Sequence, residues 1–279
     1  MKKQYIRHLP GFKYDELLHK YTFNGIEVKS VTQLIDFLKK GFDANIISKK
    51  MSKKAKEEGN DVGPEFYTEL WGTKSDWAKY TGSACHALAL SEFMQPGYIK
   101  PRHEYDRAIV QLMNRIKEKF EILAMEVKSV CVSYMIGYTY DILLKDKETG
   151  KIYFGDFKTN EAYTQEQFKE LKKKNAALLK DELGALGMRE VVCDTAAIQL
   201  YMYKKLFEAD GLGQIDGLLV FHISPELYGA KTPYKMYNLK WQPFAHIIDK
   251  LLDDNREQYV PKEEKVQGGI KIPRTFARL

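Results

Sequence analysis

The spacing of hydrophobic and polar residues along the chain predicts a succession of helices and strands. Apolar residues recur at helical spacing in four segments, which are predicted to be helices: residues 74–93, 105–120, 195–208 and 243–258. Segments rich in Val, Ile, Tyr and Thr are predicted to be strands: residues 126–134, 138–145, 151–158 and 217–224. The first three strands are separated by short turns, which predicts an antiparallel meander. The order indicates a mixed α/β fold, in which helices flank one β-sheet.

The N-terminal part of the chain is predicted to be a hairpin followed by helices. Asn24-Gly25 is a strong hairpin-turn pair, and it divides residues 21–29 into two short strands. Ser30 stands where a helix N-cap belongs, directly before apolar residues at helical spacing. The segment 49–58 is dominated by lysine, and we interpret it as the solvated face of a helix.

We expect three parts along the chain. Residues 1–73 form an N-terminal hairpin and helical region packed on the core, and residues 74–260 form the core itself. Within the core, a lysine-rich helical insertion is expected at residues 161–190. Residues 261–279 are rich in Lys, Gly, Pro and Arg and are expected to form a basic tail.

Composition and charge exclude several classes of protein. Hydrophobic residues make up 44% of the chain and charged residues 29%, which argues against a disordered or fibrous protein. The formal net charge of +6 is compatible with a polyanionic partner without requiring one. The three cysteines are widely spaced and match neither a disulfide framework nor a zinc site, so a reducing compartment is expected. Since the apolar runs are too short to span a bilayer and no signal peptide is evident, we expect a soluble, cytoplasmic protein without a membrane partner.

Two carboxylates and one amine are predicted to meet on adjacent strands. Asp156 and Lys158 are two residues apart on one predicted strand, so their side chains leave the same face. Asp141 lies on the preceding strand, and the turn at residues 146–150 brings it beside them. Neighbouring carboxylates repel each other unless a cation separates them, which indicates a site for a hard divalent metal ion. Such a site suits phosphodiester hydrolysis, whereas Asp-x-Lys taken alone is more typical of a surface ion pair.

Four short motifs extend this pattern along the chain. They are Gly-x-x-x-His ending at His86, Gly-x-x-x-Asp ending at Asp141, Asp-x-Lys-Thr at residues 156–159, and Gln-Leu-x-x-Tyr at residues 199–203. Their order and content resemble the motifs of the PD-(D/E)xK nuclease superfamily, in its RecB-like and Cas4-like branch. The Ser-Val-Thr segment that begins at Ser30 is similar to a segment of phage-type exonucleases and of the mitochondrial genome maintenance exonuclease. The resemblance implies a restriction-endonuclease-like core and a metal-dependent nuclease.

The resemblance also implies a role for each matching residue. Asp141 and Asp156 ligate the metal, and His86 completes the side-chain ligands. Phe157 contributes its main-chain carbonyl, and Lys158 is the catalytic base or an electrostatic stabiliser. The other matching residues are expected to support the site or to contact DNA: Gln199, Tyr203, Thr159 and Ser30.

Several of these residues also have a purely structural interpretation. His86 could be a satisfied core histidine, and Gln199 and Tyr203 could be ordinary helix surface and core. Glu126, on the strand before Asp141, could equally support the site or have a structural role. The lysine-rich stretch 169–180 could be a solvated helical surface, or it could form a wall over a DNA strand that contacts phosphates without reading bases.

The expected cofactor is Mg2+ or Mn2+, since oxygen ligands suit magnesium and an imidazole ligand suits manganese better. Three scattered cysteines cannot form the four-cysteine iron–sulfur cluster that some members of the branch carry, so no such cluster is expected. We expect an exonuclease that acts on single-stranded DNA ends in replication, recombination or repair, with replication or recombination proteins as candidate partners. If the protein is phage-encoded, it works in the cytoplasm of the bacterial host cell. The alternatives are a structure-specific or restriction-like endonuclease and a nucleic-acid-binding module without catalysis.

Overall fold

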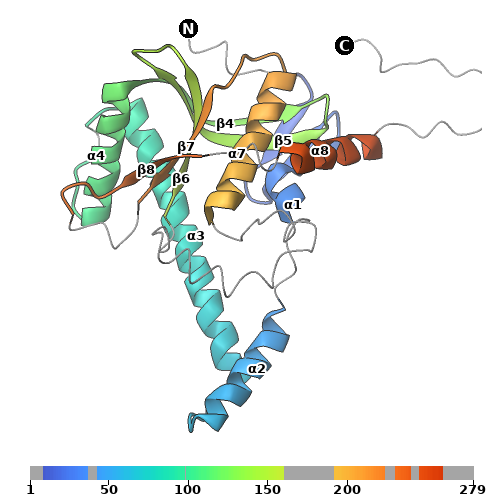
Figure 1. Cartoon of the computed structure of the whole chain (residues 1–279), viewed down its shortest axis with the longest axis vertical. Helices are drawn as coiled ribbons and strands as arrows, with labels where there is room; N and C mark the ends of the chain where they lie inside the picture. The colour runs from blue at the N-terminus through green and yellow to red at the C-terminus, as the bar shows by residue number, and fades with distance from the viewer. Residues whose placement is uncertain are drawn as a thin grey trace, which may run out of the picture.

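The computed structural model describes residues 9–36, 43–97, 99–159, 192–223, 230–239 and 245–259. Within these residues the chain forms six helices and one eight-stranded mixed sheet (Figure 1), which confirms the predicted mixed α/β class. The elements are, in order, β1 (Phe12–Asp15), β2 (Lys20–Phe23), β3 (Ile26–Ser30), α1 (Val31–Asp36), α2 (Ala44–Glu57), α3 (Pro64–Met94), α4 (Glu104–Lys119), β4 (Phe120–Cys131), β5 (Ile136–Asp146), β6 (Ile152–Lys158), α7 (Val192–Ala209), β7 (Gly217–His222), β8 (Lys235–Asn238) and α8 (Ala245–Tyr259).

Strand β5 is the centre of the sheet. Along one edge it pairs with β4 in antiparallel orientation over its whole length. Its other edge is shared, because β3 pairs in parallel with the first two residues of β5 and β6 pairs antiparallel with residues 142–145. The sheet continues from β6 to β7 in parallel and from β7 to β8 antiparallel, while β2 and β1 extend it beyond β3. The predicted meander is therefore confirmed in β4, β5 and β6.

Helices cover both faces of the sheet. Alternate residues of β7 point to the two sides: Leu218 packs in a cluster with residues of α1, α7 and α8, and Leu219 packs in a cluster with residues of α3 and α4. Close packing on the α3 side requires a glycine at position 155 of β6, since a Cβ there would lie 2.5 Å from Phe221 and 2.6 Å from Ile142. The sheet is thus buried on both sides in its central strands, which explains their long apolar runs.

Helices α2 and α3 extend away from the sheet (Figure 1). Helix α3 has 31 residues, and its buried side chains (Cys85, Ala89 and Glu92) all lie in its C-terminal part. A helix of that length spans about 46 Å, so its N-terminal half projects beyond the globular body. Asp43 caps the N-terminus of helix α2, since its side chain accepts a hydrogen bond from Ile46 N (3.0 Å), and the helix packs against α3. We call α2 together with residues 64–80 of α3 the arm.

Most predicted elements lie within a few residues of the observed ones, and the differences have physical causes. Helix α3 begins at Pro64 instead of residue 74, because its first half lacks the buried face that makes a helix visible as a periodic pattern. Strands β1 and β8 were not predicted, since each has four residues and lies at an edge of the sheet. The expected boundary between residues 73 and 74 falls inside α3.

Other expectations fall beyond what the structure describes. The lysine-rich insertion at 161–190, including the stretch 169–180, and the basic tail at 261–279 lie outside the described residues. Of the helices in the described ranges, none combines the length and the apolar character needed to cross a membrane.

Candidate metal centre

Three carboxylates occupy one rung of the sheet, across strands β4, β5 and β6. Met125 pairs with Ile142 and Val127 pairs with Tyr140, so the register places Glu126 opposite Asp141. On the other edge of β5, the ladder with β6 ends where Ile142 faces Gly155, so that Asp156 stands at the next position, opposite Asp141. The sequence-based expectation that Asp141 and Asp156 lie side by side agrees with this register.

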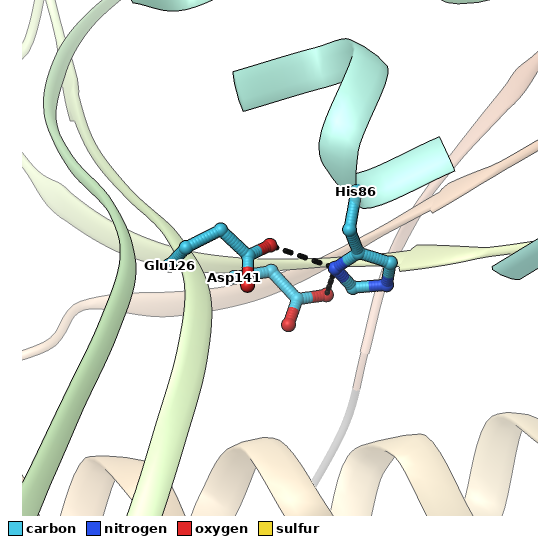
Figure 2. Close-up of side chains that lie close together, drawn as sticks. All are labelled: His86, Glu126 and Asp141. Atoms are coloured by element: carbon cyan, nitrogen blue, oxygen red, sulfur yellow. Dashed lines mark hydrogen bonds and ion pairs between the residues drawn. The ribbon is translucent and has the colours of Figure 1, made fainter. Parts of the chain in front are cut away.

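His86 of α3 lies over this rung and contacts two of its carboxylates. Its Nδ1 atom is 2.7 Å from Oε1 of Glu126 and 3.7 Å from Oδ2 of Asp141. Figure 2 shows the three side chains converging from α3, β4 and β5. One ligand atom from each residue lies within 4.8 Å of the others, which makes these three the group that could hold a metal ion among the described residues.

The backbone of β4 has an unusual conformation at Glu126. Glu126 has φ = 50°, in the left-handed region that non-glycine residues seldom adopt. Such a conformation costs on the order of 1–3 kcal/mol and persists where surrounding contacts impose it, often at functional sites. The side chain is 21% exposed and is held by His86. Backbone strain and ion pairing therefore coincide at one residue, which supports a role for Glu126 in the site.

Asp141 is held by the strand that carries Asp156. The backbone N–H of Phe157 donates a hydrogen bond of 2.9 Å to Oδ2 of Asp141, at the point where β6 leaves the ladder with β5. The ring of Phe157 packs edge-on against the imidazole of His86, with ring centroids 5.8 Å apart. Phe157 thus contacts Asp141 through its amide and His86 through its ring, and the resemblance implies a further role for its carbonyl.

Asp156 and Lys158 form a separate ion pair beside the three-residue group. Nζ of Lys158 lies 2.7 Å from Oδ2 of Asp156, as expected for side chains that leave the same face of a strand. Asp156 is buried, at 2% exposure, whereas the Lys158 side chain is 22% exposed. The close group thus contains two of the expected ligands, His86 and Asp141, together with Glu126.

The protonation of the site reflects this crowding of acids. Burial and the charge of Asp156 raise the pKa of Asp141 to about 8, although His86 opposes the shift. Burial alone would lower the pKa of His86, but the charge of Asp141 and the contact with Glu126 raise it to about 9. Burial also opposes ionisation of Lys158, yet Asp156 and Asp141 outweigh it and raise the pKa of this amine. Asp141 and His86 therefore hold protons near neutral pH, and a divalent cation is the natural replacement for those protons.

The donor set fits a divalent cation such as Mg2+ or Mn2+. Two ligands at about 2.1 Å from an octahedral ion, at right angles to each other, are roughly 3 Å apart. The observed separations of 2.7 and 3.7 Å from Nδ1 of His86 bracket that value. Carboxylate oxygens suit both ions, and the imidazole nitrogen suits Mn2+ better than Mg2+.

The Gln-Leu-x-x-Tyr motif lies on α7, on the other side of the carboxylates. Nε2 of Gln199 donates a hydrogen bond of 2.6 Å to the hydroxyl of Tyr203, one helical turn away. Tyr203 is buried, and burial together with the charges of Asp141 and Asp156 raises the pKa of its hydroxyl well above the ordinary value. These two residues brace each other next to the site, and Gln199 keeps partial exposure.

The last two expected residues have structural contacts. Ser30 caps α1: its Oγ accepts a hydrogen bond from Gln33 N (3.2 Å), while Ser30 N donates one to the Gln33 side chain (2.7 Å). This reciprocal pair is a capping box. Thr159 directly follows β6 and lies beside α3, because a Cβ on Gly82 would be 3.8 Å from its Oγ1. Thr159 therefore lies where α3 meets the strand that carries Asp156 and Lys158.

No protein-family model matches the chain, and no curated protein matches it.

Proposed function

We propose that this protein is a divalent-metal-dependent nuclease of the PD-(D/E)xK type, with a restriction-endonuclease-like core, and that it degrades DNA from single-stranded ends. The observation that carries the proposal is the group of His86, Glu126 and Asp141, with the ion pair of Asp156 and Lys158 on the neighbouring strand at the position opposite Asp141. Carboxylates and an imidazole that can hold a divalent cation, with an amine beside them, are the groups that phosphodiester hydrolysis needs.

In this proposal His86, Glu126 and Asp141 hold the ion. When bound, Mg2+ or Mn2+ supplies an acidic water and neutralises charge that develops on the phosphoryl oxygens. The amide of Phe157 keeps the Asp141 carboxylate in position. Because its carboxylate neighbours raise the pKa of Lys158, this side chain remains an ammonium ion, which favours electrostatic stabilisation of the anionic transition state over a role as base.

The choice of DNA ends as substrate rests on the motif pattern and on the mild basic charge. The four motifs occur in the same order as those of RecB-like nucleases, and this resemblance favours single-stranded ends as the substrate. The net charge of +6 is compatible with a polyanion. No base-reading module such as a zinc finger is evident in the sequence, so recognition of backbone and ends is favoured over recognition of a base sequence.

End-labelled linear and circular DNA, each single-stranded and double-stranded, tests the proposal when incubated with Mg2+, Mn2+ or chelator. We expect linear single strands to be degraded only with metal, and circular single strands to survive. Cleavage of the circles would replace the exonuclease with an endonuclease. A wild-type protein that cleaves no substrate with either metal would contradict the nuclease proposal, and Asp141→Asn serves as the matched inactive control.

A further inference from the structure

The middle of α3 is a stretch of helix without a packed face. Every residue from 72 to 80 is exposed, which amounts to about two and a half turns. A helix that only bridges two parts of a protein is normally polar all round. This stretch instead carries two large aromatic side chains, Trp77 and Tyr80, each of them 69% exposed. Phe66, nearer the start of α3, is 53% exposed.

Trp77 and Tyr80 form a pair of adjacent rings on the surface of the arm. Their centroids are 5.9 Å apart and their planes are tilted by 32°. Aromatic rings stabilise a protein most when they are buried against other groups. Two neighbouring rings left in contact with water lack this stabilisation, which a binding partner that covers them would restore. Side chains of this kind are found where unpaired bases stack, because every base offers a flat face regardless of sequence.

The two rings lie on the same helix as His86, on its N-terminal side. Trp77, Tyr80, Ser83 and His86 follow one another at intervals of three residues along α3. Such a row is a continuous ridge on a helix surface, and it winds half a turn around α3 between its first and last members. Along the helix axis, Tyr80 is about 9 Å and Trp77 about 13.5 Å from His86. Ser83 lies between Tyr80 and His86 in this row and is small and exposed, so no bulky side chain separates the rings from the histidine along the row.

The neighbouring helix of the arm provides positive charge. Helix α2 contains five lysines and one acidic residue, Glu57, which gives it a net charge of 5 − 1 = +4. All five lysines are exposed: Lys49, Lys50, Lys53, Lys54 and Lys56. Among the described residues, an ion-pair partner within 4.0 Å is found for Lys54 alone, namely Glu58 at 3.7 Å. The arm thus carries exposed lysines on one helix and exposed rings on the helix packed against it, which are the two features that bind single-stranded nucleic acid.

We infer that the arm binds single-stranded DNA, with Trp77 and Tyr80 stacked on unpaired bases and the α2 lysines next to the phosphates. This inference rests on the proposed function and deepens it, because the arm explains why a single strand is preferred. In a paired duplex the bases are already stacked on one another, so few base faces are available for the rings to stack on. With one phosphate per 3.4 Å of stacked strand, the separation of the rings from His86 along the helix axis equals the length of roughly three to four nucleotides. Like charges on α2 argue against a second copy of the arm as its partner.

Binding measured in chelator tests the inference without any cleavage. Fluorescence anisotropy is recorded for labelled oligo(dT) and for a blunt duplex of equal length, over a range of salt. One variant, Trp77→Ala with Tyr80→Ala, removes the rings. Its control is Met94→Ala, which removes a side chain that is 73% exposed at the far end of α3.

The other variant replaces four α2 lysines by glutamine, namely Lys49, Lys50, Lys53 and Lys56. Its control replaces four exposed lysines elsewhere, namely Lys13, Lys151, Lys235 and Lys250.

We expect the ring variant to lose about 30-fold or more in affinity for oligo(dT) and less than about threefold for the duplex. The α2 variant should lower the slope of log affinity against log salt by about 2.8, from four lost contacts at about 0.7 each, and its control should leave that slope near the wild-type value. Equal losses for oligo(dT) and duplex, or wild-type binding by both arm variants, would overturn the inference. So would light scattering that shows a wild-type dimer dissociated by the ring variant. Failure of the nuclease proposal is seen separately, as absence of metal-dependent cleavage by the wild type.

Discussion

Replacing Asp141 by asparagine should stabilise the metal-free protein and destabilise it relative to wild type once metal is added. In the folded state the pKa of Asp141 is raised from 3.8 to about 8, first by burial and then by Asp156. Stability linked to this carboxyl is therefore complete below pH 3.8 and is lost as the pH rises towards 8. Between pH 5 and pH 8 the loss is at most about 4 kcal/mol, at about 1.4 kcal/mol per pH unit.

Asparagine avoids this loss and keeps the geometry. Its carbonyl oxygen can still accept the hydrogen bond from Phe157 N, which is 2.9 Å long in the wild type. Since attraction by His86 and Lys158 offsets part of the cost of the charge, we expect Asp141→Asn to raise the free energy of unfolding by about 1–3 kcal/mol at pH 8 in chelator. The gain should shrink towards pH 5, where the wild-type carboxyl is largely protonated.

Metal should reverse the order of stability. At a Mn2+ concentration of about 100 times Kd, binding adds about 2.7 kcal/mol to the wild type, and the asparagine variant should gain much less. Urea unfolding at both pH values, with chelator and with Mn2+, measures all four differences. Asp146→Asn is the matched control: backbone hydrogen bonds from Thr149 and Glu148 lower the pKa of this buried carboxyl, so its loss should destabilise the protein with or without metal. An Asp141→Asn variant that is less stable than wild type in chelator at pH 8 would refute the reasoning.

Three further predictions concern the same site. Lys158→Ala should reduce cleavage by about 100-fold or more while Mn2+ binding persists in calorimetry, because its ammonium stabilises charge without being a metal ligand; retained cleavage would remove the assigned role. Glu126→Gln should weaken Mn2+ binding by about tenfold or more, whereas the exposed Glu121→Gln on the same strand should not, and equal affinities would exclude Glu126 as a ligand. Affinity for Mn2+ should rise with pH up to about 9, because the pKa values of Asp141 (about 8) and His86 (about 9) mean that the metal must displace protons. Calorimetry in buffers of different ionisation enthalpy should detect that proton release, and its absence at pH 7 would contradict the shifts.

The sequence predicts the centre of this fold well because the centre follows simple patterning rules. Strands β4, β5 and β6 are rich in β-branched and aromatic residues and are joined by short turns, so a meander is the natural prediction. Placing Asp141 beside Asp156 requires only the turn at residues 146–150, which the structure contains. The ion pair of Asp156 with Lys158 follows from the pleat of a single strand.

The position of Glu126 is harder to predict because it depends on where the turn between β4 and β5 lies. The glycine at position 137 suggests a turn there, but the observed turn spans residues 132–135 and ends at Met135, which has φ = 54°. A hairpin centred on that earlier turn places Glu126 opposite Asp141, whereas one centred near Gly137 does not. A shift of a few residues in the turn thus decides which acid joins His86.

The arm is hidden from sequence patterns for a different reason. A helix that packs on a core shows apolar residues at regular spacing, but residues 72–80 are exposed on every side. The sequence predicts a solvated helix face at residues 49–58, and the lysines there are exposed on α2. That the helix carrying them packs against α3 becomes visible only in three dimensions (Figure 1).

The most direct test of the metal centre is anomalous diffraction from crystals grown with Mn2+. The account predicts one strong anomalous peak within about 2.3 Å of Nδ1 of His86 and of carboxylate oxygens of Glu126 and Asp141. A map without a peak between these three side chains, at a Mn2+ concentration that saturates binding in solution, would contradict it.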